Sequence, residues 1–227
     1  LIIAIIIRSL LLQPFYIPSS SMEPTLLVGD RLFVTKYSYG YSKHSFPFSP
    51  NFSGNRFFFR KPAQGDLVVF KTPADNRTDY IKRLIGLPGD EIQFINGELY
   101  INKNIVSREP TDISEEINCG NFTLNTQTFI ETLPNGDRHY ATYNREGTLQ
   151  NTKLYKVPKN HYFLMGDNRD CSKDSRFLEE VGYVKKINLV GKAKIIFFSN
   201  NTKIGSVLKF WNWHNSFRIE RTFEKLS

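Results

Sequence analysis

Short runs of alternating apolar and polar residues recur along most of this chain and predict a protein built mainly of β-strands. Residues 31–37 alternate in this way, residues 66–71 form a short apolar run with charged ends, and residues 190–198 form a longer apolar run. Successive side chains of a strand point to opposite faces, so such runs predict strands that bury at least one face. No long helical periodicity is seen after residue 13. We therefore expect a mostly β fold with an antiparallel sheet as its core.

Two Asn-Gly pairs, at residues 96–97 and 135–136, separate further alternating runs. Asn-Gly favours the tight turns of β-hairpins, because both positions accept a positive φ. Residues 91–157, which contain both pairs, are polar and rich in Thr and Asn. We interpret 91–157 as an inserted β subdomain that interrupts a core made of residues 14–90 and 158–227.

The N-terminal segment is apolar at almost every position of residues 1–12. A membrane-spanning helix needs about 20 such residues, so we interpret residues 1–13 as the C-terminal part of a transmembrane helix. Arg8 fits a position near the membrane interface, where its guanidinium reaches water. A buried strand or core helix is an alternative that a run this short leaves open.

Residues 41–61 combine many Phe side chains with Lys and Arg and contain no acidic residue. Their Pro and Gly content predicts a loop, whose aromatic side chains either fold back into the core or form a membrane-facing patch. The net charge of +8 suits anionic lipid and nucleic acid alike. The four histidines and two cysteines show no metal-ligand spacing, so neither a metal nor another cofactor is expected.

Three serines stand between two prolines in residues 18–26, directly behind the apolar segment. Pro24 lacks a backbone donor and pushes the preceding residue out of the α region, so a fixed, extended turn is predicted. Taken alone, such a turn is more often a linker or a helix cap than a site.

Lys82 is the only charged residue on one face of the strand predicted over residues 79–86. Burial among Tyr80 and Leu84, with Arg83 nearby, would lower the pKa of Lys82 from about 10.4 to about 8 and make it a base. An edge lysine that reaches water is the alternative. Residues 165–176 predict a compact polar loop, whose Ser172 or Ser175 could orient such a lysine.

Four segments in the same order resemble bacterial type I signal peptidases, the membrane-anchored serine proteases that remove signal peptides. They are residues 18–26 (PSSSMEPTL), 29–36 (GDRLFVTK), 80–90 (YIKRLIGLPGD) and 166–176 (GDNRDCSKDSR). The chain departs from the family pattern at Cys171, where Asn is usual, and at Ser20, where Gly is common.

The resemblance implies a site residue by residue. Ser21 would be the nucleophile and Lys82 the general base of a Ser/Lys dyad. The Ser19 hydroxyl and the Ser21 backbone N–H would form the oxyanion hole. The residues that would orient the base or support the site are Ser172, Asp174, Ser175 and Arg176. Those that would line the substrate pocket are Phe15, Ile17, Pro18, Met22, Tyr80 and Ile81.

The same resemblance implies the substrates and the location. The substrates would be exported preproteins with small residues at the positions one and three before the cut. The protein would be single-pass in the bacterial inner membrane, in contact with lipid, with its catalytic domain on the periplasmic or outer side and no nucleic-acid partner. A Ser/Lys self-cleaving repressor is an alternative, but it requires an N-terminal DNA-binding module where this chain is apolar. A non-enzymatic, membrane-tethered binding module is another.

Cys119 and Cys171 are the only cysteines. An oxidising compartment favours a disulfide between them, yet Cys119 belongs to the predicted insertion and Cys171 to the polar loop. A bridge would tie the loop to a separate unit, so we predict free thiols and near-normal activity for Cys171→Asn.

Overall fold

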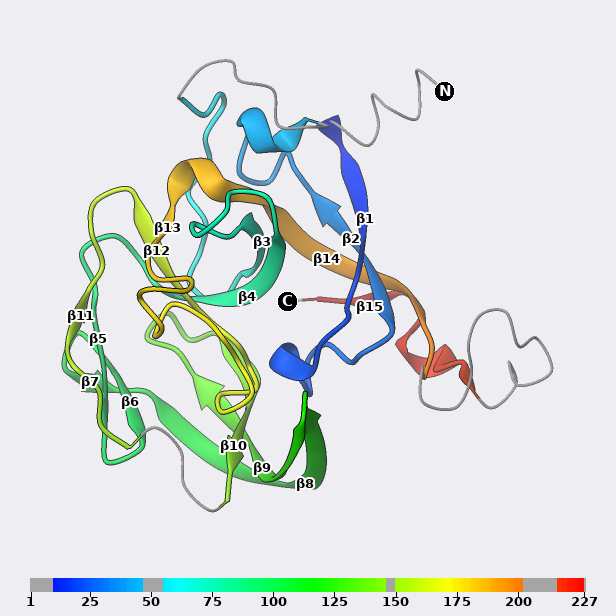
Figure 1. Ribbon diagram of the computed structural model, residues 1–227, viewed down its shortest axis with the longest axis vertical. Helices are drawn as coiled ribbons and strands as arrows, with labels where there is room; N and C mark the ends of the chain where they lie inside the picture. The colour runs from blue at the N-terminus through cyan, green and yellow to red at the C-terminus, as the bar shows by residue number, and fades with distance from the viewer. Residues whose placement is uncertain (1–9, 47–54, 146–149, 202–215, 227) are drawn as a thin grey trace.

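The computed structural model describes residues 10–46, 55–145, 150–201 and 216–226 (Figure 1). Within these ranges the regular secondary structure is almost entirely antiparallel β-strand, joined by turns and loops, and the helical segments are short 3₁₀ turns. The predicted mostly β fold is confirmed.

One large sheet carries the first and last parts of the chain. Its hydrogen-bonded order is β1-β2-β14-β3-β4-β12-β13, and β15 also pairs with β14. The strands are β1 (Leu12–Tyr16), β2 (Asp30–Thr35), β3 (Leu67–Lys71), β4 (Asp79–Gly86), β12 (His161–Met165), β13 (Val184–Lys185), β14 (Leu189–Ser199) and β15 (Glu224–Lys225). The sheet curls (Figure 1), and residues of both β1 and β4 line one cleft.

Residues 91–157 form two smaller sheets. The first contains β5 (Glu91–Ile95), β6 (Glu98–Ile101), β7 (Asn104–Ile105) and β11 (Tyr155–Lys156), and the second contains β8 (Ser107–Cys119), β9 (Phe122–Thr132) and β10 (Arg138–Asn144). Both predicted hairpins are found. Asn96 and Gly97 have φ of 51° and 79° between β5 and β6, and Gly136 has φ of 86° between β9 and β10.

The two small sheets share a hydrophobic core with the large one. Ile92 and Phe94 of β5 pack in one cluster with Ile85 of β4 and with Phe163 and Met165 of β12. The insertion therefore lies against the strands that carry the predicted site, and its position relative to that site is fixed by shared packing.

The N-terminal expectations fall partly outside the described residues. Residues 1–9 are not described, and β1 already begins at Leu12, where Leu12 and Gln13 pair with Thr35 and Val34. Residues 12 and 13 therefore belong to the sheet, which corrects their assignment to the anchor, because their backbone groups find partners on β2. Among the described residues, no helix has the length and apolar character needed to cross a membrane.

In the aromatic and basic loop of residues 41–61, some side chains fold into the core and others are exposed. Arg56 is buried and donates to the Gly40 carbonyl oxygen at 2.6 Å, and Phe59 packs against the core. Phe57 and Phe58 are 49% and 85% exposed. Phe48 and Phe52 lie outside the described residues.

Cys119 and Cys171 form a disulfide, with their Cα atoms 5.4 Å apart. The prediction of free thiols was wrong, because the insertion is not remote from the polar loop. The end of β8 lies beside the 3₁₀ turn at residues 20–22 (Figure 1), where Ser20 Oγ donates to the Asn118 carbonyl oxygen and the disulfide ties Cys119 to Cys171.

Candidate active site

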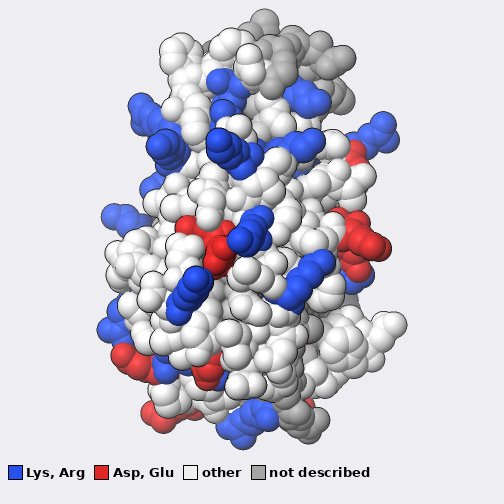
Figure 2. Space-filling view, turned by 90° about the vertical axis from the view of Figure 1, so that its left-hand side faces the viewer, with Lys and Arg blue, Asp and Glu red and all other residues white. Residues whose placement is uncertain are grey.

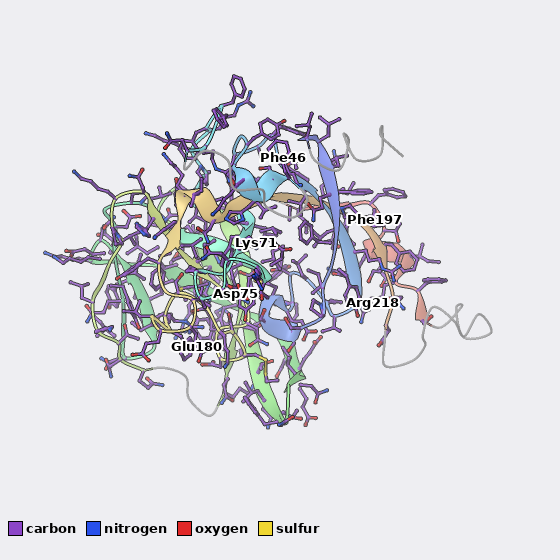
Figure 3. All side chains as sticks on the ribbon, turned by 45° about the horizontal axis from the view of Figure 1, so that its top comes forward. Phe46, Lys71, Asp75, Glu180, Phe197 and Arg218 are labelled. Atoms are coloured by element: carbon purple, nitrogen blue, oxygen red, sulfur yellow. A yellow bond between two sulfur atoms is a disulfide. The ribbon has the colours of Figure 1, made fainter. Side chains whose placement is uncertain are left out.

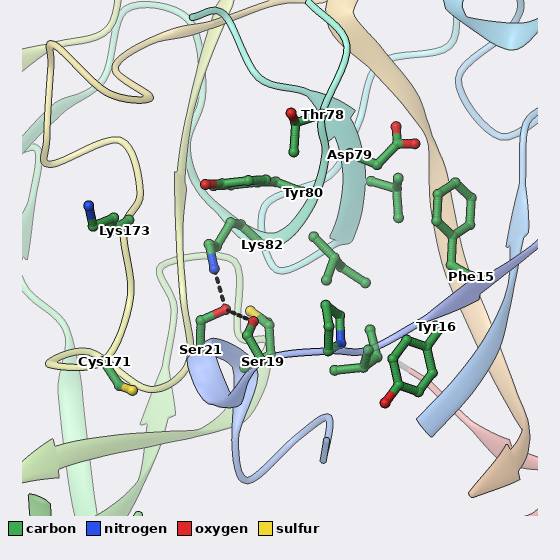
Figure 4. A pocket seen from close by; sticks show the side chains of 15 residues that line it. Phe15, Tyr16, Ser19, Ser21, Thr78, Asp79, Tyr80, Lys82, Cys171 and Lys173 are labelled. Atoms are coloured by element: carbon green, nitrogen blue, oxygen red, sulfur yellow. Dashed lines mark hydrogen bonds between the residues drawn. The ribbon is translucent and has the colours of Figure 1, made fainter. Parts of the chain in front are cut away.

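A cleft of about 400 Å³ lies between β1, β4, the turn at residues 19–22 and the 166–176 loop (Figure 4). All six residues predicted to line the substrate pocket border it: Phe15, Ile17, Pro18, Met22, Tyr80 and Ile81. It is also lined by residues that the sequence did not single out, among them Thr78, Asp79 and Lys173. The cleft is mainly apolar around Phe15 and Ile81 and becomes polar toward Ser21 and Lys173.

The serine turn, residues 19–22, presents Ser21 to this cleft. Ser19 is extended, and residues 20–22 close one 3₁₀ turn in which the Glu23 N–H donates to the Ser20 carbonyl oxygen at 3.1 Å. The sequence predicted an extended turn; residues 20–22 instead form a single helical turn that buries Met22. Ser21 is 9% exposed, and its hydroxyl is 3.4 Å from that of Ser19.

Lys82 reaches Ser21 from the middle of β4. Its ammonium group donates to Ser21 Oγ at 2.5 Å, and only 3% of the residue is exposed (Figure 4). Burial lowers the pKa of Lys82 to about 8, with Arg176 acting in the same direction and Asp174 and Asp167 opposing it. A lysine with this pKa is substantially neutral near pH 8 and can accept a proton.

Arg83 does not act on Lys82 in the way the sequence suggested. Its guanidinium lies on the other face of β4, where Nε and Nη2 each donate to the Asp167 carboxylate at 2.8 Å. Thr25 Oγ1 donates to the same carboxylate at 2.5 Å. This buried group joins β4, the 166–176 loop and the segment after the serine turn. This cluster was not predicted from the sequence, although Arg83, a charged residue inside an apolar strand, indicated a buried partner.

A second buried ion pair shapes the 166–176 loop. Arg176 Nε donates to Asp174 Oδ1 at 2.8 Å, and Asp174 Oδ2 accepts from the Gly166 N–H at 3.0 Å. Ser175 Oγ accepts from the Leu164 N–H at 2.9 Å, which fixes the loop to β12. Asp174, Ser175 and Arg176 are thus part of the framework beside Lys82.

Ser172 is near the dyad, but its expected contact with Lys82 is not seen. Its hydroxyl is buried and has no hydrogen-bond partner among the described residues. A Cβ atom added to Gly166 would approach within 3.0 Å of both Ser172 Oγ and the Ser21 carbonyl oxygen. Only glycine therefore allows Ser172 and the serine turn to come so close together.

The turn between β3 and β4 holds the outer rim of the cleft. Asp75, labelled in Figure 3, accepts from Thr72 Oγ1 at 2.6 Å and from the Arg77 N–H at 2.8 Å. Lys71 pairs with Asp79 at 2.9 Å. These contacts fix the start of β4, so that Asp79 and Tyr80 face the cleft (Figure 4).

Comparison with known proteins identifies the family of this chain. The family described as "Signal peptidase, peptidase S26" matches residues 1–198. Signal peptidase I of Rickettsia typhi is 42% identical over 243 residues, covering 99% of this chain and 89% of that protein. Signal peptidase I of Rickettsia conorii is 43% identical over 245 residues, covering 99% and 88%.

A signal peptidase I from Enterococcus faecalis, known from a crystal structure, is 28% identical in sequence to this chain. The match covers 59% of this chain and 97% of the crystallised chain. Its TM-score of 0.35 is too low to add to the fold argument. The family match and the Rickettsia relatives cover most of the chain, including all four segments on which the resemblance rests. This chain therefore belongs to the signal peptidase family, peptidase S26, a family of serine endopeptidases.

Proposed function

We propose that this protein cleaves signal peptides by acyl transfer, with Ser21 as nucleophile and Lys82 as general base. The observation that carries the proposal is the 2.5 Å contact between Lys82 Nζ and Ser21 Oγ inside the cleft. A serine hydroxyl is a weak nucleophile until a base takes its proton, and a lysine can do so only when it is neutral. The buried position of Lys82 meets that condition.

The proton moves twice through Lys82. Neutral Lys82 accepts the Ser21 proton as Oγ attacks the scissile carbonyl, and the resulting ammonium group protonates the leaving amine. The acyl-enzyme that remains is hydrolysed by a water molecule that neutral Lys82 activates. The tetrahedral oxyanion would be stabilised by the Ser19 hydroxyl and the Ser21 backbone N–H. The 3.4 Å separation of the two serine hydroxyls supports this assignment.

The other predicted site residues support the dyad in this proposal. Asp174, Ser175 and Arg176 hold the loop against β12 and keep Lys82 buried. Ser172 would orient Lys82; its hydroxyl is buried beside the serine turn at Gly166 and has no hydrogen-bond partner among the described residues, which supports this role.

The first prediction concerns pH. The base must be neutral in the free enzyme, so kcat/KM is expected to rise with pH through one ionisation near the pKa of Lys82, about 8. No histidine lines the cleft among the described residues, so no histidine is required. A pH–rate profile with a precursor peptide measures this. An inflection near a free histidine's pKa of about 6.5, or near a free lysine's of about 10.4, would contradict it.

The second prediction concerns the substrate. We expect an extended peptide to pair beside the cleft, with small residues one and three positions before the cut on the apolar surface of Phe15, Ile17 and Ile81. A precursor with Ala at both positions should be cleaved, and one with Trp one position before the cut should be cleaved at least tenfold more slowly. Mass spectrometry of the products locates the cut. Equal cleavage of both precursors would contradict the pocket assignment.

We further propose the arrangement in the cell. The apolar residues before β1 would end a membrane anchor, and the catalytic core of residues 14–90 and 158–227, with 91–157 inserted, would lie on the periplasmic or outer side of the bacterial inner membrane. The apolar character of residues 1–7 and membership of the signal peptidase family support this arrangement.

The third prediction concerns contact with lipid. Phe57 and Phe58 are exposed beside the exposed Arg60 and Lys61, and basic side chains are spread over the face in Figure 2. Protein lacking residues 1–9 should float with phosphatidylglycerol vesicles at low salt and be released by high salt. Phe58→Ser should weaken this binding, and uncharged phosphatidylcholine vesicles are the control. Absence of binding at low salt would show that the loop does not contact lipid.

A further inference from the structure

Three segments meet at the Cys119–Cys171 disulfide, at the edge of the cleft. Cys119 ends β8, Cys171 belongs to the 166–176 loop, and Ser20 belongs to the serine turn. Ser20 Oγ donates to the Asn118 carbonyl oxygen at 2.7 Å and lies 3.2 Å from Cys171 Sγ. The bridge thus joins the hairpin and the loop covalently, and hydrogen bonds of Ser20 attach the serine turn to the same junction.

A short chain of contacts connects this junction to the nucleophile. The Cys171 N–H donates to Asn168 Oδ1 at 3.2 Å, and the Asn168 N–H donates to the Ser21 carbonyl oxygen at 3.2 Å. Ser172 follows Cys171 in the chain. Its hydroxyl and the Ser21 carbonyl oxygen both lie close against Gly166. Movement of Cys171 would therefore displace the backbone that holds both Ser21 and Ser172.

The hairpin end has few other restraints. Residues 112–116 and 120–123 are exposed, and the buried residues near the end of β8 are Ile117 and Cys119. Segments with few buried apolar contacts open locally at low free-energy cost. The disulfide is therefore a major restraint that keeps the hairpin end against the serine turn.

We propose that Cys119 and Cys171 are positioning residues for cleavage: their disulfide clamps the β8–β9 hairpin onto the serine turn and the 166–176 loop, and so keeps Lys82 shielded from water. This inference rests on the proposed Ser21/Lys82 mechanism. It makes full activity depend on oxidation of the cysteine pair. The enzyme would become fully active only after its chain reaches an oxidising environment.

Opening the clamp should change the pKa of Lys82. The charged and polar groups around its ammonium are Ser21 on the serine turn, Tyr80 on β4, and Asp167, Asp174 and Arg176 on the 166–176 loop. Arg83 lies on the other face of β4, paired with Asp167. Burial is the largest cause of the lowered pKa of Lys82. Opening the clamp admits water, so that pKa should rise and the neutral fraction near pH 7 should fall.

Reduction by dithiothreitol opens the bridge without a mutation. The S–S bond breaks, two protein thiols form, and the reagent gives up two electrons and two protons to become a cyclic disulfide. Because the chain has only two cysteines, any effect of the reagent on the protein can be assigned to this pair. The control is Cys119→Ser/Cys171→Ser, on which dithiothreitol should have no effect.

The experiment compares pH profiles of kcat/KM for the oxidised enzyme, the reduced enzyme and the double variant, each below its Tm. For a rise of one unit in the pKa of Lys82, kcat/KM near pH 7 should fall about tenfold, and the profiles should converge above about pH 10. Reoxidation should restore the reduced enzyme. The Cys171→Asn variant should behave like the reduced enzyme, which replaces the near-normal activity expected on the assumption of free thiols.

Several outcomes would overturn the inference. A lower Tm with an unchanged pH profile would assign the disulfide to stability alone, and an equal loss at every pH would show that it does not act through Lys82. Two alkylatable thiols in the oxidised protein would show that the bridge is absent. Activity of Ser21→Ala and Lys82→Met would instead refute the proposed mechanism, whatever the disulfide does.

Discussion

Replacing Lys82 by methionine is expected to leave a folded protein that has lost cleavage of precursors. Removal of the base should lower kcat/KM by about 10⁴-fold, at the upper end of what a general base contributes. Methionine has a similar length but no amine, and because 3% of Lys82 is exposed, the substitution removes a buried polar group from its site. The Tm should therefore be maintained, so that lost activity cannot be attributed to unfolding. Single-turnover cleavage of a precursor peptide measures the effect.

Lys82→Arg is the complementary variant. Arginine retains the positive charge but does not deprotonate in proteins, so activity should stay low up to about pH 10.5. The matched control is Lys36→Met. Lys36 is 2% exposed and donates to the Ser45 carbonyl oxygen at 2.5 Å, yet it does not line the cleft. Lys36→Met should retain activity; substantial cleavage by Lys82→Met would refute the dyad.

Replacing Asp174 by alanine is expected to cause the largest loss of stability. The carboxylate is fully buried, accepts two bonds from the Arg176 guanidinium at 2.8 and 2.9 Å, and also accepts from the Arg176 and Gly166 backbone N–H groups. Removing one partner of a buried ion pair leaves the other charge unpaired, which costs about 3–5 kcal/mol. Urea unfolding should show this decrease in the free energy of unfolding.

The control for that variant is Glu180→Ala. Lys173 and Glu180 form an ion pair at 2.9 Å with side chains 69% and 49% exposed, and such a pair contributes about 0–1 kcal/mol. A loss for Asp174→Ala no larger than that for Glu180→Ala would contradict the structural role of the buried pair.

The contribution of Asp174 to stability should also depend on pH. Burial alone would raise the pKa of this carboxyl, but Arg176 and the Gly166 N–H outweigh burial and hold the pKa below its usual value. Its contribution to stability is therefore present above the unfolded pKa of about 3.9 and is lost as the pH falls through the lower folded value. The difference in stability between wild type and Asp174→Asn should shrink in this acidic range.

The local elements of the fold could be predicted because their causes lie in adjacent residues. Alternation along residues 31–37 and 79–86 specified strands, and Asn96-Gly97 specified a hairpin because both residues accept a positive φ. The chemistry of the site was equally local. A lysine among apolar neighbours on a strand indicated a base, and the segments around Ser21 and Lys82 carried the family resemblance.

Contacts between distant segments were decided only by the tertiary structure. Arg83 and Asp167 are 84 residues apart, Thr25 and Asp167 are 142 residues apart, and the two cysteines are 52 residues apart. No local preference encodes such contacts, because they depend on how the sheet curls and on where the β8–β9 hairpin returns. The sequence alone determined a β protein with a serine and a lysine suited to acyl transfer. The position of the 166–176 loop beside β4 decided which charges surround Lys82, and packing of the insertion against β4 and β12 brings Cys119 to that loop.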